Sequence, residues 1–351
     1  MKTYGFGIVG CGMIADVHAA AIAELDLGRL AAVSSRHSEN VRRLVDRYHV
    51  DGYSDYREML KRDDLDIVCV CTPSGAHLEA AVAAAEAGKH VIVEKPLEIT
   101  LDRCDEIIQT CDEAGVRLCA IFNSRFVGGS QLLKKTIDSG RFGTLTLGDA
   151  YVKWHRSQAY YDSGGWRGTW KLDGGGSLMN QSIHAVDLLQ YFMGPVKAVQ
   201  AFTSTLAHER IEVEDVAVAA LRFANGALGI IEGSTAVYPG FLKRIEISGS
   251  NGTVILEEED ITTWEFDPEL PEDAEIRRKY ARRQSGGGGA ADPREIKHAN
   301  HRRQITDFIH SINSGTPHLV DGREGRKAVE IILAIYKSSR EGRIVHLPLE
   351  Q

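Results

Sequence analysis

The chain has 351 residues, of which 43% are hydrophobic and 26% are charged, and its formal net charge is −8. This length accommodates two domains with a sizeable core, and the composition is ordinary for a soluble globular protein. The acidic balance disfavours nucleic acid and anionic membrane surfaces as partners. Because no signal peptide precedes the first apolar run and no run is long enough to span a bilayer, we expect a cytoplasmic protein.

The first third of the chain alternates apolar runs with helical patterns. The apolar runs predict buried strands at residues 4–9, 30–34, 67–71, 90–93 and 117–121. The stretches between them predict helices at residues 14–25, 39–48, 56–61, 76–88 and 101–114. Strands that alternate with helices indicate a parallel, doubly wound sheet, so we expect an α/β domain over residues 1–122.

A glycine turn separates the first predicted strand from the first predicted helix. It contains Gly10, Gly12 and Ala15, which in this context form a dinucleotide-binding fingerprint. The first glycine permits a sharp turn, the second lets a pyrophosphate approach the backbone, and the small third residue lets the helix pack closely. The helix N-terminus offers N–H groups to the phosphates. The expected cofactor contacts in the turn are Gly10, Cys11, Gly12, Met13 and Ile14.

The end of the second predicted strand favours NADP over NAD. Dinucleotide enzymes usually place a carboxylate here, about 20 residues past the glycines, to bind the ribose hydroxyls. Residues 33–37 contain no carboxylate, and Ser35 and Arg36 offer hydrogen-bond donors that suit a 2′-phosphate. The alternative is that Arg36 stacks on the adenine or points to water and that NAD binds. The expected cofactor is therefore NAD or NADP, with NADP favoured.

Two further predicted strands end in polar residues. Ligands of open parallel sheets bind at the carboxyl ends of the strands, so these residues are cofactor-site candidates. They are Thr72, Pro73, His77, Glu94 and Lys95. Lys95 is expected close to the nicotinamide, where it could take a proton from a hydroxyl or polarise a carbonyl in the reverse direction. The alternative for a single lysine after a strand is a surface ion pair.

After residue 123 the apolar runs become longer, and several of them alternate polar and apolar residues. They predict strands at residues 145–154, 198–206, 216–223, 226–234, 243–248 and 252–257. Helices are predicted at residues 130–139, 184–192, 301–314 and 325–340. The alternation indicates a large, mostly antiparallel sheet with one covered and one open face, in an α+β domain over residues 123–351. An open face needs covering, so we expect a homodimer or homotetramer.

A second polar cluster follows a glycine run at residues 174–176. Asn180 and His184 are four residues apart and therefore share one face of the predicted helix, and Asp187 could orient the imidazole. A histidine on such a face can also be a satisfied core residue. The glycine run and the neighbouring Asn180 favour a role in a site.

These motifs together resemble those of the glucose–fructose oxidoreductase and inositol dehydrogenase family (Gfo/Idh/MocA type). The resemblance lies in the glycine turn and in residues 94–96, 123–126, 166–167, 174–187 and 321–328. It implies an N-terminal Rossmann domain, a C-terminal domain with a large open sheet, and Lys95 and His184 as the catalytic pair. It also implies cofactor contacts from Asn123 and from the pair Trp166 and Arg167, which in many members reaches over the cofactor.

The chain departs from the family at one position. Many members carry aspartate one turn before the catalytic histidine, where this chain has Asn180. Asparagine cannot accept a proton, so the resemblance does not extend an acid–base relay through this position. Members that act on modified or nucleotide-linked sugars look similar here. We retain Asn180 as a candidate catalytic residue.

Substrate contacts are expected from side chains that could face the cleft between the two domains. They are Lys95, Arg125, Lys153, His155, Asn180, His184, Tyr238 and His301. No metal site is expected, because His298 and His301 have no further ligand at matching spacing. The basic residues 277–283 are expected to be a solvated face, and the glycines 286–289 predict a loop.

The combined features predict an NAD(P)-dependent oxidoreductase that acts on a sugar, a sugar derivative or a cyclic polyol. A hydride would move between the nicotinamide and a ring carbon, and Lys95 and His184 would handle the alcohol proton. The same residues would serve an enzyme in which a tightly held cofactor transiently oxidises a sugar before a glycosidic bond breaks. The intact pair Lys95 and His184 argues against a third alternative, a non-catalytic NAD(P)-binding regulator.

Overall fold

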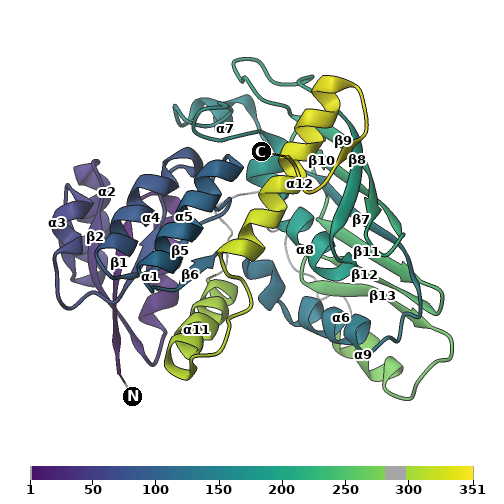
Figure 1. The fold of residues 1–351 in the computed structure, drawn as a ribbon, viewed down its shortest axis with the longest axis horizontal. Coiled ribbons are helices and arrows are strands. Elements are labelled where there is room, and N and C mark those ends of the chain that lie inside the picture. Colours follow the sequence, from purple (N-terminus) through teal and green to yellow (C-terminus); the bar gives the residue numbers. More distant parts are fainter. Residues whose placement is uncertain (1, 281–297, 351) are drawn as a thin grey trace. The chain divides into compact units, whose positions relative to one another are not determined.

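The structure is a computed structural model that describes residues 2–280 and 298–350 (Figure 1). The chain divides into two compact units. The first unit comprises Met1–Asn123, Lys171–Gly174 and Ile296–Val329, and the second comprises Ser124–Trp170, Gly175–Glu295 and Glu330–Gln351. The chain thus leaves the first unit close to the boundary expected after residue 122 and later returns to it twice.

The first unit is built on a six-stranded parallel sheet in the order β3-β2-β1-β4-β5-β6 (Figure 1). Its strands are β1 Tyr4–Val9, β2 Gly28–Ser34, β3 Asp51–Tyr53, β4 Ile67–Val70, β5 His90–Val93 and β6 Leu118–Ala120. β1 and β4 are buried along their whole length, as continuous apolar runs predict for strands covered on both faces. The Rossmann-type sheet expected from the sequence is confirmed.

Helices from both ends of the chain complete the first unit. They are α1 Met13–Ala23, α2 Ser38–Tyr48, α3 Tyr56–Leu60, the 3₁₀ helix η1 Ser74–Ala76, α4 His77–Glu86, α5 Leu101–Glu113 and α11 Ala299–Ser314. The helix α11 packs against α1. Its residues Ile305, Phe308 and Ile309 join Phe6 and Ile8 in one core cluster. A late segment of the chain therefore finishes a core that the N-terminal strands begin.

The strand order of the first sheet reverses beside β1, because β2 and β3 continue on one side and β4, β5 and β6 on the other. Ligands of open α/β sheets bind at such a switch point. Gly10 follows β1 here with a φ of 93°. A Cβ at this position would lie 2.6 Å from the Cys71 carbonyl oxygen, so the turn requires glycine.

The second unit contains an eight-stranded sheet in the order β13-β12-β11-β7-β10-β9-β8-β14 (Figure 1). Its strands are β7 Leu145–Lys153, β8 Val196–Ser204, β9 Val216–Phe223, β10 Leu228–Ser234, β11 Arg244–Gly249, β12 Gly252–Glu257, β13 Asp260–Phe266 and β14 Val345–His346. All neighbouring strands are antiparallel except β7 and β10, which run parallel. The expected large, mostly antiparallel sheet is confirmed, and β13 and β14 extend it beyond the predicted strands.

Helices cover one face of the second sheet. The helical segments of this part of the chain are η2 Asn123–Phe126, α6 Gly128–Asp138, α7 Gln158–Asp162, the π-helix η3 Ser177–Ser182, α8 Ile183–Met193, α9 Asp273–Tyr280 and α12 Gly322–Glu341. The first residues of η2 and α12 still belong to the first unit. The helix α8 packs on β7 and β11. Residues of β9 alternate between buried and exposed, as a strand with one open face requires.

The stretch 267–297, which shows no regular pattern in the sequence, contains the helix α9. Its apolar residues are few, so periodicity does not reveal it. The predicted glycine loop 286–289 and the basic residues Arg282 and Arg283 lie outside the described residues.

Within residues 2–280 and 298–350, no helix is long and apolar enough to cross a bilayer. All six cysteines are buried thiols. Burial raises the pKa of Cys11 to about 11 and that of Cys111 to about 12, so both stay protonated near neutral pH.

Candidate functional site

The glycine turn of the first unit leaves open space before the start of α1. The helix α1 begins after Gly12, and no side chain caps its first N–H groups. A Cβ placed on Gly12 would meet open space, whereas Ala15 is completely buried. N–H groups at a helix start, with open space before them, suit an anion such as a pyrophosphate. The residues of the turn therefore fit a dinucleotide cofactor.

Arg43 on α2 is a cation beside this turn that the sequence does not single out. One of its guanidinium nitrogens donates to the Cys11 carbonyl oxygen at 3.0 Å, and another pairs with Asp16 in the first turn of α1. At the end of β2, Ser35 Oγ accepts a hydrogen bond from His37 N at 3.3 Å, and Arg36 is exposed. Two arginines therefore lie on the segments that flank the turn.

His77 links the segments that follow β4 and β5. Its Nε2 lies 3.0 Å from the Thr72 carbonyl oxygen and its Nδ1 lies 2.9 Å from the Pro96 carbonyl oxygen. The ring is 1% exposed. Both nitrogens therefore face the backbone, so His77 holds the two strand ends together. Pro73, the remaining candidate there, directly precedes η1.

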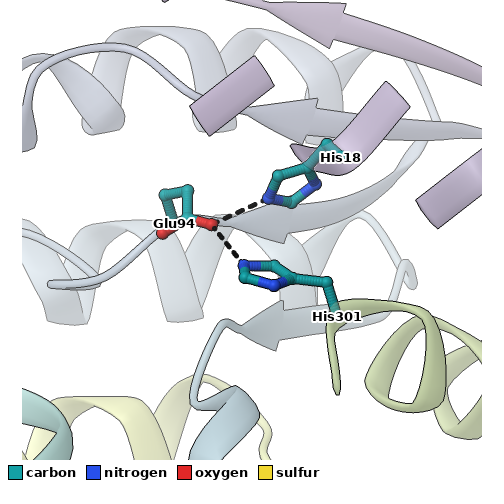
Figure 2. A group of neighbouring side chains, drawn as sticks. All are labelled: His18, Glu94 and His301. Atoms are coloured by element: carbon teal, nitrogen blue, oxygen red, sulfur yellow. Dashed lines mark hydrogen bonds and ion pairs between the residues drawn. The ribbon is translucent and has the colours of Figure 1, made fainter. Parts of the chain in front are cut away.

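The carboxylate of Glu94, at the end of β5, contacts two histidines (Figure 2). Its Oε1 lies 2.8 Å from Nε2 of His18 on α1 and 3.4 Å from Nε2 of His301 on α11. Its Oε2 accepts a hydrogen bond from Lys95 N at 3.1 Å. The side-chain amide of Asn123 donates to His301 Nδ1 at 3.1 Å, which leaves Nε2 as the protonated nitrogen that donates to Glu94.

This cluster has unusual electrostatics because all three side chains are buried. Burial alone would raise the pKa of the Glu94 carboxyl, but hydrogen bonds from His18 and His301 outweigh it and hold that pKa well below its usual range. Burial lowers the pKa of His301, against the opposing effect of Glu94. The cluster therefore keeps a carboxylate ionised directly beside the backbone of Lys95.

Two imidazoles and a carboxylate are also a set that could hold a metal ion, since their ligand atoms lie within 4.8 Å of one another. His298, which the sequence pairs with His301, is not part of this set, because its Nε2 lies 2.9 Å from Glu24 Oε1. The second imidazole is that of His18, which is distant from His301 in the sequence. The contacts described above involve Nε2 of both histidines and Oε1 of Glu94, and among the described residues His18 Nδ1 has no hydrogen-bond partner.

Lys95 is the one partly exposed residue in a stretch of the first unit that is otherwise buried. Within residues 91–98 it is half-buried, and every other residue is buried. The ordered backbone around it comes from the Glu94 contact and from the His77 link to Pro96. The side chain of Lys95 therefore projects from a fixed position at the carboxyl end of β5.

In the second unit, η3 and α8 present a comparable arrangement. From residue 175 to residue 190, all of which the structure describes, only Asn180, Gln181 and His184 are not fully buried. Gln181 Nε2 donates to Asn180 Oδ1 at 2.8 Å, and Asn180 N donates to the Gly176 carbonyl oxygen at 3.1 Å. Asn180, Gln181 and His184 are therefore the polar side chains with which this segment reaches the surface of the unit.

Arg125 is a buried structural side chain, although the sequence suggests a substrate contact. Its Nε and Nη2 donate to the two carboxylate oxygens of Asp187 at 2.9 and 2.6 Å, and its guanidinium lies 4.4 Å from the Tyr191 ring centroid. Arg125 is 1% exposed and Asp187 is 0% exposed. Asp187, expected to orient His184, therefore forms a two-point ion pair with Arg125 that anchors α8.

The other candidates of the second unit are more exposed. Lys153 pairs with Glu232 at 3.2 Å, and the His155 and Tyr238 rings meet edge to face at 5.3 Å. Tyr238 is 80% exposed. The Arg167 guanidinium lies 5.0 Å from the Trp166 ring centroid. Lys153, His155 and Tyr238 thus belong to one exposed region of the second unit, while His301 is a buried member of the Glu94 cluster in the first.

Comparison with known proteins identifies the family. Residues 4–122 match the oxidoreductase family with an NAD-binding Rossmann fold, and residues 130–255 match the GFO/IDH/MocA C-terminal domain. The chain belongs to the Gfo/Idh/MocA oxidoreductase family. The resemblance seen in the sequence motifs is therefore confirmed, and the turn at Gly10 belongs to an NAD-binding domain.

Several Gfo/Idh/MocA proteins match along their whole length. The crystal structure of the WlbA dehydrogenase from Bordetella pertussis in complex with NADH and UDP-GlcNAcA has a TM-score of 0.90 and 35% identity, covering 100% of this chain and 99% of that one. The WlbA structure from Chromobactrium violaceum, with the same ligands, has a TM-score of 0.89 and 34% identity, covering 100% and 98%. The myo-inositol 2-dehydrogenase of Thermotoga maritima is 31% identical over 350 residues, or 97% of this chain and 98% of that protein.

Proposed function

We propose that this Gfo/Idh/MocA chain is an NAD(P)-dependent dehydrogenase of a sugar, a sugar derivative or a cyclic polyol. One observation carries the proposal. Each unit has a buried segment from which the candidate catalytic side chain reaches the surface, Lys95 in the first and His184 in the second. Side chains held in this way by buried backbone suit proton transfer, which needs a fixed geometry.

The residues of the first unit would hold the cofactor. The N–H groups after Gly12 would bind the pyrophosphate, and Ser35 and Arg36 would face the adenosine ribose, where they would tolerate a 2′-phosphate. When bound, the nicotinamide would accept a hydride from a ring carbon or return one to it. The WlbA structures contain NADH, so NAD is the first cofactor to test, and Ser35 with Arg36 is the reason to test NADP beside it.

Lys95 and His184 would manage the proton of the reacting hydroxyl. In the oxidation direction, the group that contacts the hydroxyl takes its proton as the carbon becomes a carbonyl, and in reduction it returns that proton. Asn180 would orient the substrate by hydrogen bonds without accepting a proton. Glu94, which two histidines hold in its ionised form, would fix the backbone of Lys95 by accepting a hydrogen bond from its N–H.

The substrate that the relatives favour is a nucleotide-linked sugar acid, with a cyclic polyol second. WlbA structures contain UDP-GlcNAcA. At the position of Asn180, this chain is similar to members that act on nucleotide-linked sugars. The Thermotoga maritima relative is named for myo-inositol. A screen of UDP-linked sugar acids, free sugars and inositols with NAD and NADP in parallel, followed by the absorbance of the reduced nicotinamide, tests the proposal. Turnover with a UDP-linked sugar acid is the expected result.

Two other outcomes of the same screen would redirect the proposal. No turnover on any class with either cofactor would contradict dehydrogenase activity. Cleavage of a glycoside without added cofactor would instead indicate the mechanism in which a retained cofactor is recycled in place.

The open face of the second sheet is the proposed oligomer interface. Phe202 on β8 is 76% exposed, and its register partner on β9, Val218, is 45% exposed. Leu228 and Ile230 on β10 are 51% and 38% exposed. Apolar side chains gathered on one sheet face are costly to leave in water, which supports pairing with a second copy of the chain.

Replacement of Phe202 by glutamate is expected to convert the oligomer into monomers, because a charge would have to be buried at the interface. Size-exclusion chromatography with light scattering measures the mass. Exchange of Leu206 for glutamate is the matched control, since Leu206 is similarly exposed at 73% but follows the end of β8. A wild-type chain that runs as a monomer would contradict the proposed interface.

A further inference from the structure

The carboxylate of Glu214 is buried beside the glycine run that precedes η3. Its Oε2 accepts a hydrogen bond from Gly176 N at 2.9 Å. Its Oε1 accepts hydrogen bonds from Leu178 N at 2.8 Å, from the Ser177 hydroxyl at 3.3 Å and from the Tyr336 hydroxyl at 2.9 Å. Glu214 is 4% exposed, and all these residues belong to the second unit. Four donors therefore face one carboxylate, of which the Ser177 hydroxyl shares its single proton with the Gly233 carbonyl oxygen at 3.2 Å.

These contacts supply hydrogen-bond acceptors for the N–H groups at the start of η3. The first N–H groups of such a segment have no acceptors within it. Glu214 accepts from two of them with its side chain, and its carbonyl oxygen accepts from Ser177 N at 3.0 Å. A Cβ on Gly176 would lie 1.8 Å from the Glu214 carbonyl oxygen, and one on Gly175 would lie 2.1 Å from Tyr336 Oη. The glycine run therefore fits closely against Glu214 and Tyr336.

The anchored segment is the one that carries the candidate site. The Gly176 carbonyl oxygen accepts from Asn180 N at 3.1 Å, so the turn that holds Asn180 starts from a residue bound to Glu214. The segment η3 continues directly into α8, where His184 is the second residue. A shift of the glycine run would therefore move both polar side chains.

We propose that Glu214 is a positioning residue for the reaction, whose ionised carboxylate holds the start of η3 so that Asn180 and His184 are correctly placed, and whose protonation weakens the hydrogen bond from one of the two backbone N–H groups. The proposal rests on the proposed function, because it assigns Asn180 and His184 to the site. The oxygen that takes the proton becomes a donor and a weaker acceptor, so the hydrogen bond from either Gly176 N or Leu178 N is weakened.

The surroundings of Glu214 allow its carboxylate to be protonated near neutral pH. Burial raises the pKa of Glu214 to about 7, although the hydrogen bonds from Leu178, Gly176 and Tyr336 oppose the rise. Tyr336 on α12 is the titratable group in direct contact. The neighbouring Asp215 faces away, because its carboxylate accepts from the N–H groups of residues 206–208 and from His208 Nδ1.

The other charged groups on adjoining elements have partners of their own. Glu212, in the same segment as Glu214, accepts from Trp170 N at 2.9 Å. On β10, Glu232 pairs with Lys153, and on α8, Asp187 pairs with Arg125. Titration of Glu214 therefore depends chiefly on its burial and on the four donors.

The global stability of the fold and the anchoring of η3 by Glu214 respond to pH in opposite directions. The pKa of Glu214 lies above its ordinary value of 4.5, so the folded protein binds the extra proton between pH 4.5 and about 7. The contribution of this group to global stability therefore falls as pH rises through that window. Positioning has the opposite sign, since the anchoring carboxylate is lost as pH falls below about 7. A loss of activity on acidification is thus not explained by global unfolding through this group.

The first experiment needs no substrate. Amide hydrogen exchange of the full-length protein is measured at pH 6 and pH 8 for peptides that cover residues 174–186, after correction for the intrinsic exchange rate. The expected result is about tenfold faster corrected exchange at pH 6 in the wild type, because a carboxyl group with a pKa of about 7 is protonated in roughly nine-tenths of the molecules at pH 6 and in roughly one-tenth at pH 8. Glu214→Gln should remove the pH difference, and Glu212→Gln, the matched control, should keep it.

The second experiment uses Tyr336→Phe, which keeps the Glu214 carboxylate but removes one donor. Loss of that hydrogen bond disfavours the ionised form, so the exchange transition and the acid limb of kcat should both move to higher pH. Equal exchange at both pH values in the wild type, or a transition that Tyr336→Phe leaves in place, would overturn the proposal. If Glu214→Gln does not fold, Tyr336→Phe still decides. Inactivity of the wild type on every substrate would contradict the proposed function and leave the exchange result as the test of Glu214.

Discussion

Replacement of Lys95 by methionine is expected to lower kcat by about 10²–10⁴-fold while the affinity for NADH stays close to that of the wild type. Methionine keeps the apolar stem of the side chain but removes the group that would take or return the hydroxyl proton. The backbone of residue 95 should stay in place, because Glu94 Oε2 accepts a hydrogen bond from its backbone N–H, which the substitution keeps. Steady-state turnover on the substrate found by the screen measures kcat, and fluorescence titration measures NADH binding.

His184→Gln tests the partner in the same assay, with a loss of the same order expected. The matched control is Lys89→Met, since Lys89 precedes the opposite end of β5, where it donates to the Arg62 carbonyl oxygen at 3.0 Å. Turnover should be unchanged in that variant. Wild-type turnover in both Lys95→Met and His184→Gln would contradict the assignment of the pair, and a loss of NADH affinity in Lys95→Met would make the lysine a binding residue instead.

The sheet of the first unit could be predicted almost completely because its signals are local. Each buried strand is a continuous apolar run, and the turn at Gly10 carries its own sequence pattern. The pairing of β7 with β10 could not be predicted in this way, since hairpin signals specify only antiparallel neighbours. The short β3 and the charged α9 give too few apolar residues for a periodic signal.

The residues of the candidate site also differ in whether local sequence signals predict them. Lys95 and His184 follow local patterns, and both lie where buried segments reach the surface. The Glu94 cluster is not local, because His18 is 76 residues from Glu94 in the sequence. Glu214 stands in a run of acidic residues that resembles a solvated loop, and only the fold shows that its carboxylate is buried. The π-helix η3 has a hydrogen-bond repeat that apolar spacing does not distinguish from an α-helix.

Replacement of Arg125 by methionine is expected to destabilise the second unit by about 3–5 kcal/mol, because the Asp187 carboxylate would remain buried without its two-point partner. The side chains are 1% and 0% exposed, so water cannot readily replace the guanidinium. All four tryptophans lie in the second unit, at positions 154, 166, 170 and 264. Tryptophan fluorescence during urea unfolding therefore reports on this unit alone.

The matched control is the exposed pair of Arg210 and Asp162, whose atoms lie 2.8 Å apart with side chains 60% and 43% exposed. Arg210→Met should change the stability far less than Arg125→Met does, because water and salt screen an exposed pair. The double variant Arg125→Met with Asp187→Leu should recover most of the lost stability, since it removes both buried charges together. Equal, small losses in Arg125→Met and Arg210→Met would contradict this account, and they would mean that α8 is held by its apolar face on β7 and β11 and not by the ion pair.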